Sequence, residues 1–324
     1  MVLAAVRVAL FLLLAVASGA WAQTYPTKPV TMIVPFAAGG PTDTVARTIG
    51  IAMQNVLKQT VVVENVGGAG GTIGVTRVAR ATPDGYTILI YHIGMATSPA
   101  LYRKLPFDPL KDFEYIGLVN DVPMTLIGRP TLQANNFKEL LPWIKATGSK
   151  VNYGNAGLGA ASHLCGLLFM SAIEVDMTTI SYKGTAPAMN DLLGGQIDLM
   201  CDQTTNTTSQ IKGGKVKAYA VTSVKRVPSL PNLPTLQEEG LKGFEVSIWH
   251  ALYAPKGTPK PVVDVLVKAN QEALKDATVK QRFADLGAEG VSMDKATPAY
   301  LQKFLAAEIA KWGPIIKKAG QYAD

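Results

Sequence analysis

Side chains that bind metals or act as nucleophiles are scarce in this sequence. Its 324 residues include two cysteines and three histidines, and the histidines lie far apart, at His92, His163 and His250. Structural zinc sites need four cysteine or histidine ligands at short, regular spacings. Because no such spacing occurs, we expect no metal site.

Basic runs and long apolar runs are also missing. The net charge of +7 is spread along the chain, without the clustered lysines, arginines and aromatic residues of nucleic-acid-binding proteins. A membrane-spanning helix needs about 20 apolar residues. The N-terminal apolar run, Val8–Val16, is shorter than that, and no later run is longer. We therefore expect neither a nucleic-acid partner nor a membrane span.

The N-terminus has the pattern of a secretory signal peptide. Arg7 precedes the apolar run, and small residues then lead to Ala20-Trp21-Ala22. An Ala-x-Ala sequence in this position marks a cleavage site. We predict a signal peptide over residues 1–22 and a soluble, periplasmic mature protein that begins at Gln23. The alternative is an uncleaved anchor.

Cys165 and Cys201 leave two alternatives open. One cysteine begins a predicted helix and the other ends a predicted strand of the same domain, so in an oxidising compartment they can pair. Two free, buried thiols are the other interpretation.

Glycine-rich turns are frequent, but they do not carry a nucleotide-binding signature. After Gly68 and Gly70, a dinucleotide fingerprint would need a third glycine at position 73, which is Ile73. The chain also has no Gly-Lys-Ser/Thr of a phosphate-binding loop. We expect no cofactor.

The sequence instead repeats a unit of strand, glycine turn and helix. A strand over 30–34 leads through Gly39 and Gly40 to Pro41 and a helix over 42–58. Free backbone N–H groups and the helix dipole at such a helix start favour an anion. A plain strand-to-helix connection is the alternative for one copy, but similar turns recur at Gly154–His163, Tyr182–Pro187 and Asp202–Asn206.

This alternation predicts an α/β fold with mostly parallel sheets in two domains. We expect one domain over residues 23–122 plus 250–324 and a second over 123–249, with a ligand cleft between them. Strands over 115–119 and 124–127 are interrupted at Asp121–Pro123, and residues 92–98 form a loop after a strand. Further predicted helices cover 72–80, 164–173, 235–240, 261–274, 277–286 and 298–318.

The chain resembles the Bug family, the periplasmic solute-binding proteins of tripartite tricarboxylate transporters. The resemblance covers nearly the whole mature chain and rests on the order and spacing of several short motifs. These are Val34-Pro35-Phe36 with Gly39-Gly40 and Asp43, Gly67-Ala69-Gly70-Gly71, Pro83-Asp84-Gly85-Tyr86, Gly157-Leu158-Gly159 with His163-Leu164, Tyr182–Ala188, Asp191–Asp198, Pro231–Gly240 and Ala254–Pro259.

This resemblance implies a two-domain clamshell that closes over a small organic carboxylate, which it delivers to a membrane permease. We also expect a monomer without enzymatic activity. The residues that it nominates for ligand binding come from loops of both domains: Phe36, Ala38, Gly39, Gly40, Thr42, Asp43, Met95 and Ser98 from the first, and Gly159, Ala161, Ser162, Tyr182, Thr185, Ala186 and Asp202 from the second.

Two alternatives to a transport receptor remain at this point. Ser162-His163 suggests a secreted serine hydrolase, but adjacent residues at a helix start point about 100° apart and no Gly-x-Ser-x-Gly turn occurs. A sensor that passes its liganded state to a membrane signalling partner would use the same fold.

Overall fold

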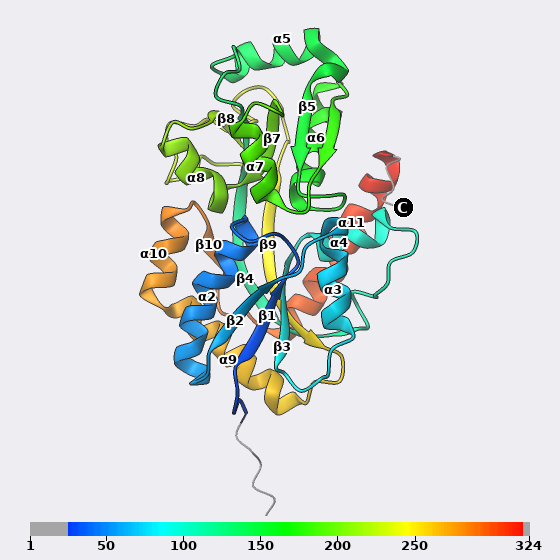
Figure 1. Ribbon diagram of the computed structural model, residues 1–324, viewed down its shortest axis with the longest axis vertical. Coiled ribbons are helices and arrows are strands. Elements are labelled where there is room, and N and C mark those ends of the chain that lie inside the picture. Colours follow the sequence, from blue (N-terminus) through cyan, green and yellow to red (C-terminus); the bar gives the residue numbers. More distant parts are fainter. Residues whose placement is uncertain (1–24, 320–324) are drawn as a thin grey trace, which may run out of the picture.

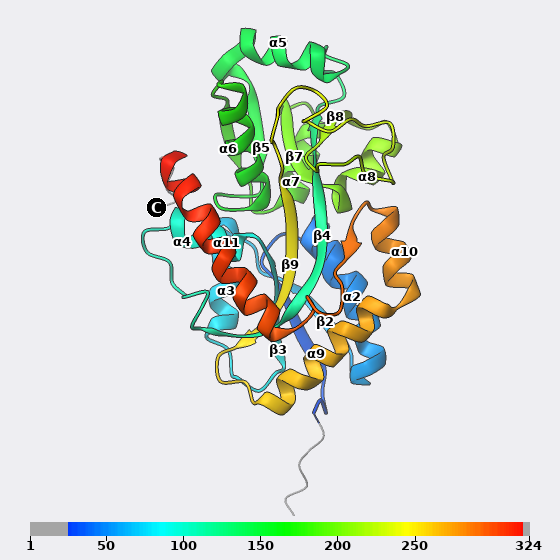
Figure 2. The ribbon, with the colours of Figure 1, turned by 180° about the vertical axis from the view of Figure 1, so that it is seen from behind.

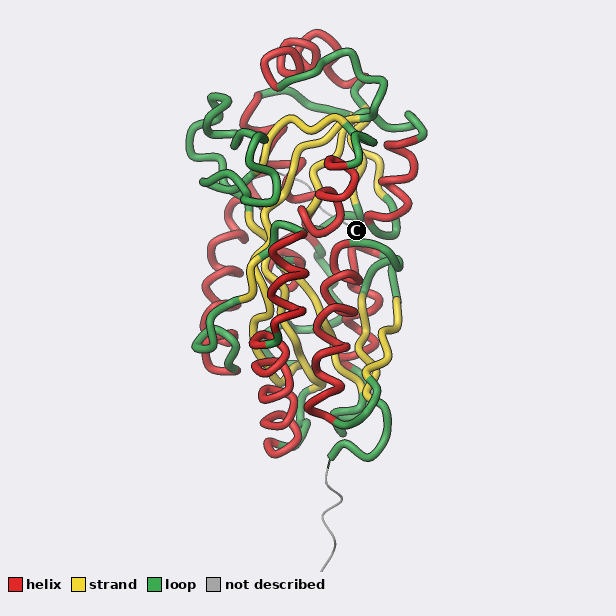
Figure 3. Tube along the Cα trace, turned by 90° about the vertical axis from the view of Figure 1, so that its left-hand side faces the viewer, coloured by secondary structure: helices red, strands yellow, loops and turns green. Residues whose placement is uncertain are grey.

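The computed structural model of the chain describes residues 25–319; the predicted signal peptide lies outside them. Two lobes lie one above the other in Figure 1, and the two long strands β4 (Phe113–Gly128) and β9 (Ser247–Pro255) run through both. Figure 3 shows the strands passing without a break from one lobe to the other. The two-domain α/β fold predicted from the sequence is confirmed, but the sheet is mixed instead of mostly parallel, because the connecting strands pair antiparallel with their neighbours.

The first lobe is built around β1, whose five residues are almost all buried. β1 pairs in parallel with β2 and β3. The helices α2 and α3 are seen on the near side in Figure 1, and α11 crosses the opposite face in Figure 2. The elements of this lobe are β1 (Val30–Val34), α2 (Pro41–Leu57), β2 (Val61–Asn65), α3 (Thr72–Ala79), β3 (Thr87–His92), α4 (Gly94–Leu101), α9 (Lys260–Lys275), α10 (Ala277–Asp285), β10 (Glu289–Gly290) and α11 (Pro298–Ala319), with a 3-10 turn at Ala69–Gly71.

The second lobe repeats this arrangement around β5, which pairs in parallel with β6 and β7. A small apolar cluster that includes Ile127, Leu192 and Met200 packs inside it. Its elements are α5 (Phe137–Thr147), β5 (Asn152–Asn155), α6 (Ala161–Ile173), β6 (Thr178–Ser181), α7 (Thr185–Leu193), β7 (Leu199–Gln203), α8 (Thr204–Lys212) and β8 (Lys217–Val221), with a 3-10 turn at Gly148–Lys150.

The strands β4 and β9 connect the lobes, and every strand pair in which either takes part is antiparallel. The sequence predicted a break in β4 at Asp121–Pro123, and this was wrong, because β4 is continuous. Pro123 has no N–H to donate, and it lies where β4 changes partner, from Ser247 of β9 to Gln203 of β7. The predicted domain limits at 122/123 and 249/250 therefore fall inside two continuous strands, and they stay a prediction.

Two other expectations were wrong. The predicted loop after β3 is the helix α4, which is almost wholly buried and carries Pro99 inside it. The predicted helix over 235–240 is a turn, because the Leu236 N–H bonds to Val221 O of β8 at 2.9 Å instead of continuing a helix. In both segments, contacts with distant parts of the chain override the local pattern.

Among residues 25–319, no helix is both long enough and apolar enough to cross a bilayer.

Candidate functional site

A small cavity lies where the two lobes meet. Its volume is about 10 Å³, room for about one water molecule. Any larger ligand can therefore enter only after the lobes move apart. The residues around it come from both lobes: Phe36, Pro41, Thr42, His92, Ala156, Ala161, Ser162, Thr185, Asp202 and Gln203.

Four helices begin at this cavity. None has a side chain at its N-cap that accepts a hydrogen bond from the first turn. The first N–H groups of a helix have no partner within the helix, and the helix dipole adds positive potential there. The cavity is thus lined by the positive ends of four helices, which start at Pro41 of α2, Ala161 of α6, Thr185 of α7 and Thr204 of α8.

Asp43, which the sequence nominated as a ligand contact, bonds to its own loop. Its Oδ2 accepts hydrogen bonds from the Gly39 N–H (3.0 Å) and from Arg47 Nε (2.9 Å), and its Oδ1 accepts one from Asn65 Nδ2 (3.0 Å). Burial opposes ionisation, but the bonds from Arg47, Gly39 and Asn65 lower the pKa of Asp43. Asp43 does not line the cavity, and the Gly39 amide, expected to face an anion, is already bonded to it.

Asp202 is placed differently. It is the next-to-last residue of β7, has 1% of its surface exposed, and lines the cavity. Its Oδ2 accepts a hydrogen bond from Asn206 Nδ2 at 2.6 Å. Burial raises the pKa of Asp202 to about 7, although hydrogen bonds from Asn206, the Gln203 backbone and Thr185 act in the opposite direction.

Two buried histidines lie on the first-lobe side. His92 lines the cavity with its ring against Phe36, at 4.8 Å between ring centroids, and its Nδ1 accepts the Gly94 N–H at 2.9 Å. Burial lowers the pKa of His92 to about 3. Burial, and to a lesser degree His92, also hold the pKa of His250 well below its usual value. His92 is therefore neutral and carries its proton on Nε2.

Behind the cavity, His250 joins the α2 start to the connecting strands. Its Nε2 lies 3.2 Å from Thr42 Oγ1, and its Nδ1 lies 2.9 Å from Asn120 Oδ1. Asn120 belongs to β4 and His250 to β9. Thr42, at the start of α2, is thereby linked to the two strands that connect the lobes.

In the second lobe, Ser162 and His163 do not form the pair that the hydrolase interpretation requires. Ser162 Oγ accepts the Ala156 N–H at 2.8 Å, and His163 Nδ1 accepts the Gly159 N–H at 3.3 Å. The two side chains hold the glycine turn before α6. Because Ser162 Oγ acts as the acceptor in this bond, its hydroxyl can still donate to a group in the cavity.

Of the nominated residues, six line the cavity: Phe36, Thr42, Ala161, Ser162, Thr185 and Asp202. Gly39 and Gly40 lie next to it, facing Ala186 and Thr185 respectively, and Ala38 is exposed beside them. Four further residues point elsewhere. Met95 and Ser98 are buried within α4, the Gly159 amide bonds to His163, and the Tyr182 hydroxyl bonds to Asp191 at 2.6 Å.

Sequence reasoning missed Pro41, His92, Ala156 and Gln203 as lining residues. For Pro41 and His92 the sequence did contain a signal, because Pro41 leads into the first predicted helix and His92 directly follows a strand of the predicted sheet. Ala156 and Gln203 had no distinguishing feature in the sequence.

The lobes touch on both sides of the cavity, so this is a closed form. Several hydrogen bonds cross between them: Ala37 N–H to Lys183 O (3.3 Å), Thr97 Oγ1 to Gly159 O (3.2 Å), Tyr102 OH to Leu158 O (2.9 Å), Thr204 Oγ1 to Gly287 O (3.0 Å) and Thr208 Oγ1 to Leu286 O (3.1 Å).

Removing the Tyr102 hydroxyl is expected to weaken closure slightly. This hydroxyl lies 2.7 Å from Ala69 O of its own lobe and 2.9 Å from Leu158 O of the other lobe. One such hydrogen bond contributes about 1 kcal/mol, so Tyr102→Phe should raise the ligand Kd about fivefold. Tyr300→Phe, at a ring stacked on Phe304 in the same lobe, should leave the Kd unchanged. Equal affinities in titration calorimetry would contradict this role for Tyr102.

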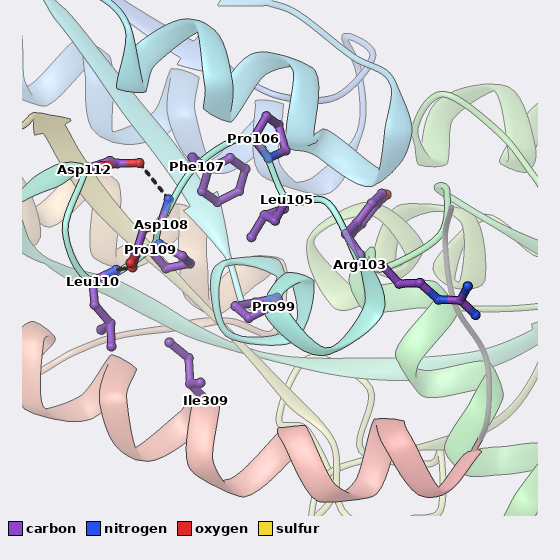
Figure 4. Close-up of a pocket in the computed structure, with 11 residues that line it drawn as sticks. Pro99, Arg103, Leu105, Pro106, Phe107, Asp108, Pro109, Leu110, Asp112 and Ile309 are labelled. Carbon is purple, nitrogen blue, oxygen red and sulfur yellow. Dashed lines mark hydrogen bonds between the residues drawn. The ribbon is translucent and has the colours of Figure 1, made fainter.

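Figure 4 shows a larger hollow, of about 610 Å³, beside α4 and α11. Proline and leucine side chains of the loop after α4 line it, together with Ile309 of α11. The Asp108 N–H is bonded there to Asp112 Oδ2 at 2.7 Å. All its lining residues belong to the first lobe, so closure of the lobes does not shape it. The cavity between the lobes is therefore the better candidate.

Cys165 of α6 and Cys201 of β7 form a disulfide, with their Cα atoms 6.0 Å apart. Of the two alternatives that the sequence left open, the structure has the paired cysteines. The bond ties α6, which begins at the cavity, to β7, the strand that carries Asp202.

Comparison with solved structures places this geometry among binding proteins. The periplasmic binding protein BugD is 58% identical, with a TM-score of 0.90, over 92% of this chain and 99% of that one. MatC from Rhodopseudomonas palustris, solved with malate, is 39% identical, with a TM-score of 0.87, over 90% and 100% of the two chains. Another R. palustris structure, solved with adipate, is 33% identical, with a TM-score of 0.86, over 91% and 98%.

The sequence also matches, over residues 45–321, the family described as "Tripartite tricarboxylate transporter family receptor". Its members and the structural relatives above are solute-binding proteins and not enzymes, which agrees with the bonding of Ser162 and His163. The chain therefore belongs to the tripartite tricarboxylate transporter receptor family, as a Bug-type solute-binding protein.

Proposed function

We propose that this protein binds a small organic carboxylate in the cavity between its lobes and delivers it to a membrane permease. The observation that carries the proposal is the meeting of four uncapped helix N-termini at a cavity lined by no lysine or arginine. Such a site holds an anion by backbone N–H groups and hydroxyls instead of by opposite charge. The malate and adipate bound to two relatives support this ligand class.

The proposed cycle begins with separated lobes. The ligand carboxylate first meets the starts of α6 and α7 in the second lobe, where the Ser162 and Thr185 hydroxyls lie. Rotation about β4 and β9 then brings Phe36, Thr42 and the α2 start onto the ligand. Exclusion of water strengthens each hydrogen bond to the carboxylate. The joined outer surfaces of the two lobes would be what the permease recognises.

In this proposal the mature protein acts as a monomer in the periplasm, after removal of residues 1–22. A di- or aromatic carboxylate is favoured over a sugar, because the cavity lining combines Phe36, Pro41, Ala156 and Ala161 with a few hydroxyl groups.

A thermal-shift comparison of acids with their amides tests the ligand class. The protein over residues 23–324 should unfold about 5 °C higher with malate or adipate at about 100 times Kd, because a ligand that binds only the native state stabilises it by about 2.7 kcal/mol. The amides of the same acids should cause no shift, since they bring no negative charge to the helix starts. A shift with sugars or cationic amines, and none with any carboxylate, would refute the proposal.

A further inference from the structure

We infer that Asp202 is protonated when the ligand is bound and that its carboxyl O–H donates a hydrogen bond to the ligand carboxylate. At a pH where free Asp202 is ionised, each binding event then takes up one proton from the solvent onto Asp202, and release of the ligand returns it. The inference rests on the proposed function and adds to it a coupling between carboxylate capture and pH.

The position of Asp202 brings it to the ligand. It lines the cavity at the end of β7, next to the starts of α7 and α8, and is 1% exposed. Its Oδ2 is bonded to the Asn206 amide at 2.6 Å, and Thr185 also bonds to its side chain. A carboxylate drawn to these helix starts must therefore come within a few ångströms of Asp202.

No positive side chain balances the two carboxylates. The cavity lining contains no lysine or arginine. The neighbouring groups on β4, α6, α7 and α8 are uncharged: Thr125, whose hydroxyl bonds to Asp202 O, then Ser162, Thr185, Thr205 and Asn206. The titratable groups that face Asp202 are Tyr153 on β5 and His92 on β3 across the cavity. Burial raises the pKa of Tyr153 and lowers that of His92, so both are neutral.

Two buried negative charges at contact distance repel each other strongly in a cavity without water, so one of them takes up a proton. Asp202 is the group already close to doing so, since burial raises its pKa to about 7 even before a ligand arrives. A bound carboxylate raises that pKa further. Once protonated, Asp202 changes from a repelling group into a hydrogen-bond donor for the ligand.

The sign of the pH dependence follows from linkage. Ligand binding raises the pKa of Asp202, so the liganded protein holds more protons than the free protein above about pH 7. Affinity for a fully ionised carboxylate should therefore change little well below pH 7, where free Asp202 is already protonated, and should begin to fall as the pH approaches 7. Above that it should fall, by up to about tenfold per pH unit.

Titration calorimetry with adipate and malate tests the coupling. At pH 8 the heats should be measured in two buffers of different ionisation enthalpy, because their difference gives the number of protons taken up. We expect close to one proton per ligand at pH 8 and clearly less at pH 6.5, where free Asp202 already carries its proton. The Kd at pH 8.5 should exceed that at pH 6.5 by at least fivefold.

Asp202→Asn provides the matched variant, because asparagine has the same shape and presents an N–H donor without charge. It should bind the acids at pH 8.5 as tightly as the native protein does at pH 6.5, with no proton uptake and no pH dependence. Asp191→Asn is the control. Asp191 lies in the same lobe, outside the cavity, where its carboxylate accepts the Tyr182 hydroxyl, and its variant should retain native proton uptake.

The outcomes separate this inference from the proposed function. If the native protein binds no carboxylate at any pH, the proposed function fails, and the inference with it. If carboxylates bind without proton uptake, the inference alone is overturned. It is also overturned if Asp202→Asn keeps its melting midpoint and loses binding, since Asp202 would then act as an ionised acceptor for a donor group of the ligand. Should that variant not fold, the proton count of the native protein decides.

Discussion

Replacing Gly70 by alanine is expected to weaken carboxylate binding about 100-fold by preventing closure of the lobes. Gly70 has a φ of +61°, and a Cβ added there would lie 1.8 Å from Leu158 O of the opposite lobe. Real atoms do not approach so closely, and the obstacle is backbone, which cannot rotate away. The lobes would have to stay apart by more than an ångström, which breaks the nearby bond between Tyr102 and Leu158.

The expected rise in Kd follows from how much closure of the lobes contributes to ligand affinity. If the closed form becomes 100-fold less populated, the apparent Kd rises by the same factor, which corresponds to about 2.7 kcal/mol. Titration calorimetry measures this directly. Small-angle scattering should show, in addition, that ligand shrinks the native protein and leaves the Gly70→Ala variant extended.

Gly214→Ala is the matched control for this experiment. Gly214 has a φ of +64°, nearly the same as Gly70, but a Cβ there would meet nothing within 4 Å. Both variants carry the strain of alanine in a left-handed conformation, about 1 kcal/mol of stability. Only the Gly70 variant also meets the other lobe. Similar affinities for the two variants would show that the contact between Gly70 and Leu158 is not part of closure.

Local signals were enough to predict the elements that begin at the site. Gly39, with a φ of +81°, forms the turn before α2, and Pro41 occupies the first position of the helix. Thr185, after Gly184, starts α7 in the same way. Because strands and helices alternate, the helix starts of each lobe had to gather at one edge of its sheet. The α/β fold and the approximate place of the site follow from these features.

The exact set of lining residues depends on contacts that the sequence does not show. Asp43 has the ordinary pattern of a helix-start residue, and only the fold reveals that Arg47 and Asn65 hold its carboxylate outside the cavity. His92 lies in a segment predicted as loop, but the Gly94 N–H at the start of α4 bonds to its ring, which lies against Phe36. The sequence therefore predicted the wrong position, relative to the cavity, for residues whose role depends on contacts formed only in the folded chain.

Loss of the disulfide is the second large effect that we expect, and it acts on stability. The bond between Cys165 and Cys201 closes a loop with a sequence separation of 36. In the chain-entropy account, a loop of this length contributes about 4 kcal/mol by restricting the unfolded chain. The double variant Cys165→Ala/Cys201→Ala should accordingly melt on the order of 10 °C lower than the oxidised protein.

Ligand affinity should change much less than stability, because Tyr153 joins the same two elements. Its hydroxyl donates to Ser162 O of α6 at 2.7 Å and accepts the Cys201 N–H of β7 at 3.1 Å. The cavity wall formed by Ser162 and Asp202 therefore stays in place, and at a temperature where both proteins are folded we expect Kd values within about threefold.

Thermal unfolding with and without a reductant checks the stability, and calorimetry checks the affinity. A reductant should lower the midpoint of the native protein to that of the double variant and should leave the variant itself unaffected. Because both cysteines are buried, their pairing is checked separately by a thiol count in the unfolded protein without reductant, where two free thiols would show that they are not paired. If the variant instead loses binding while still folded, then the disulfide, and not Tyr153, holds the start of α6 against β7.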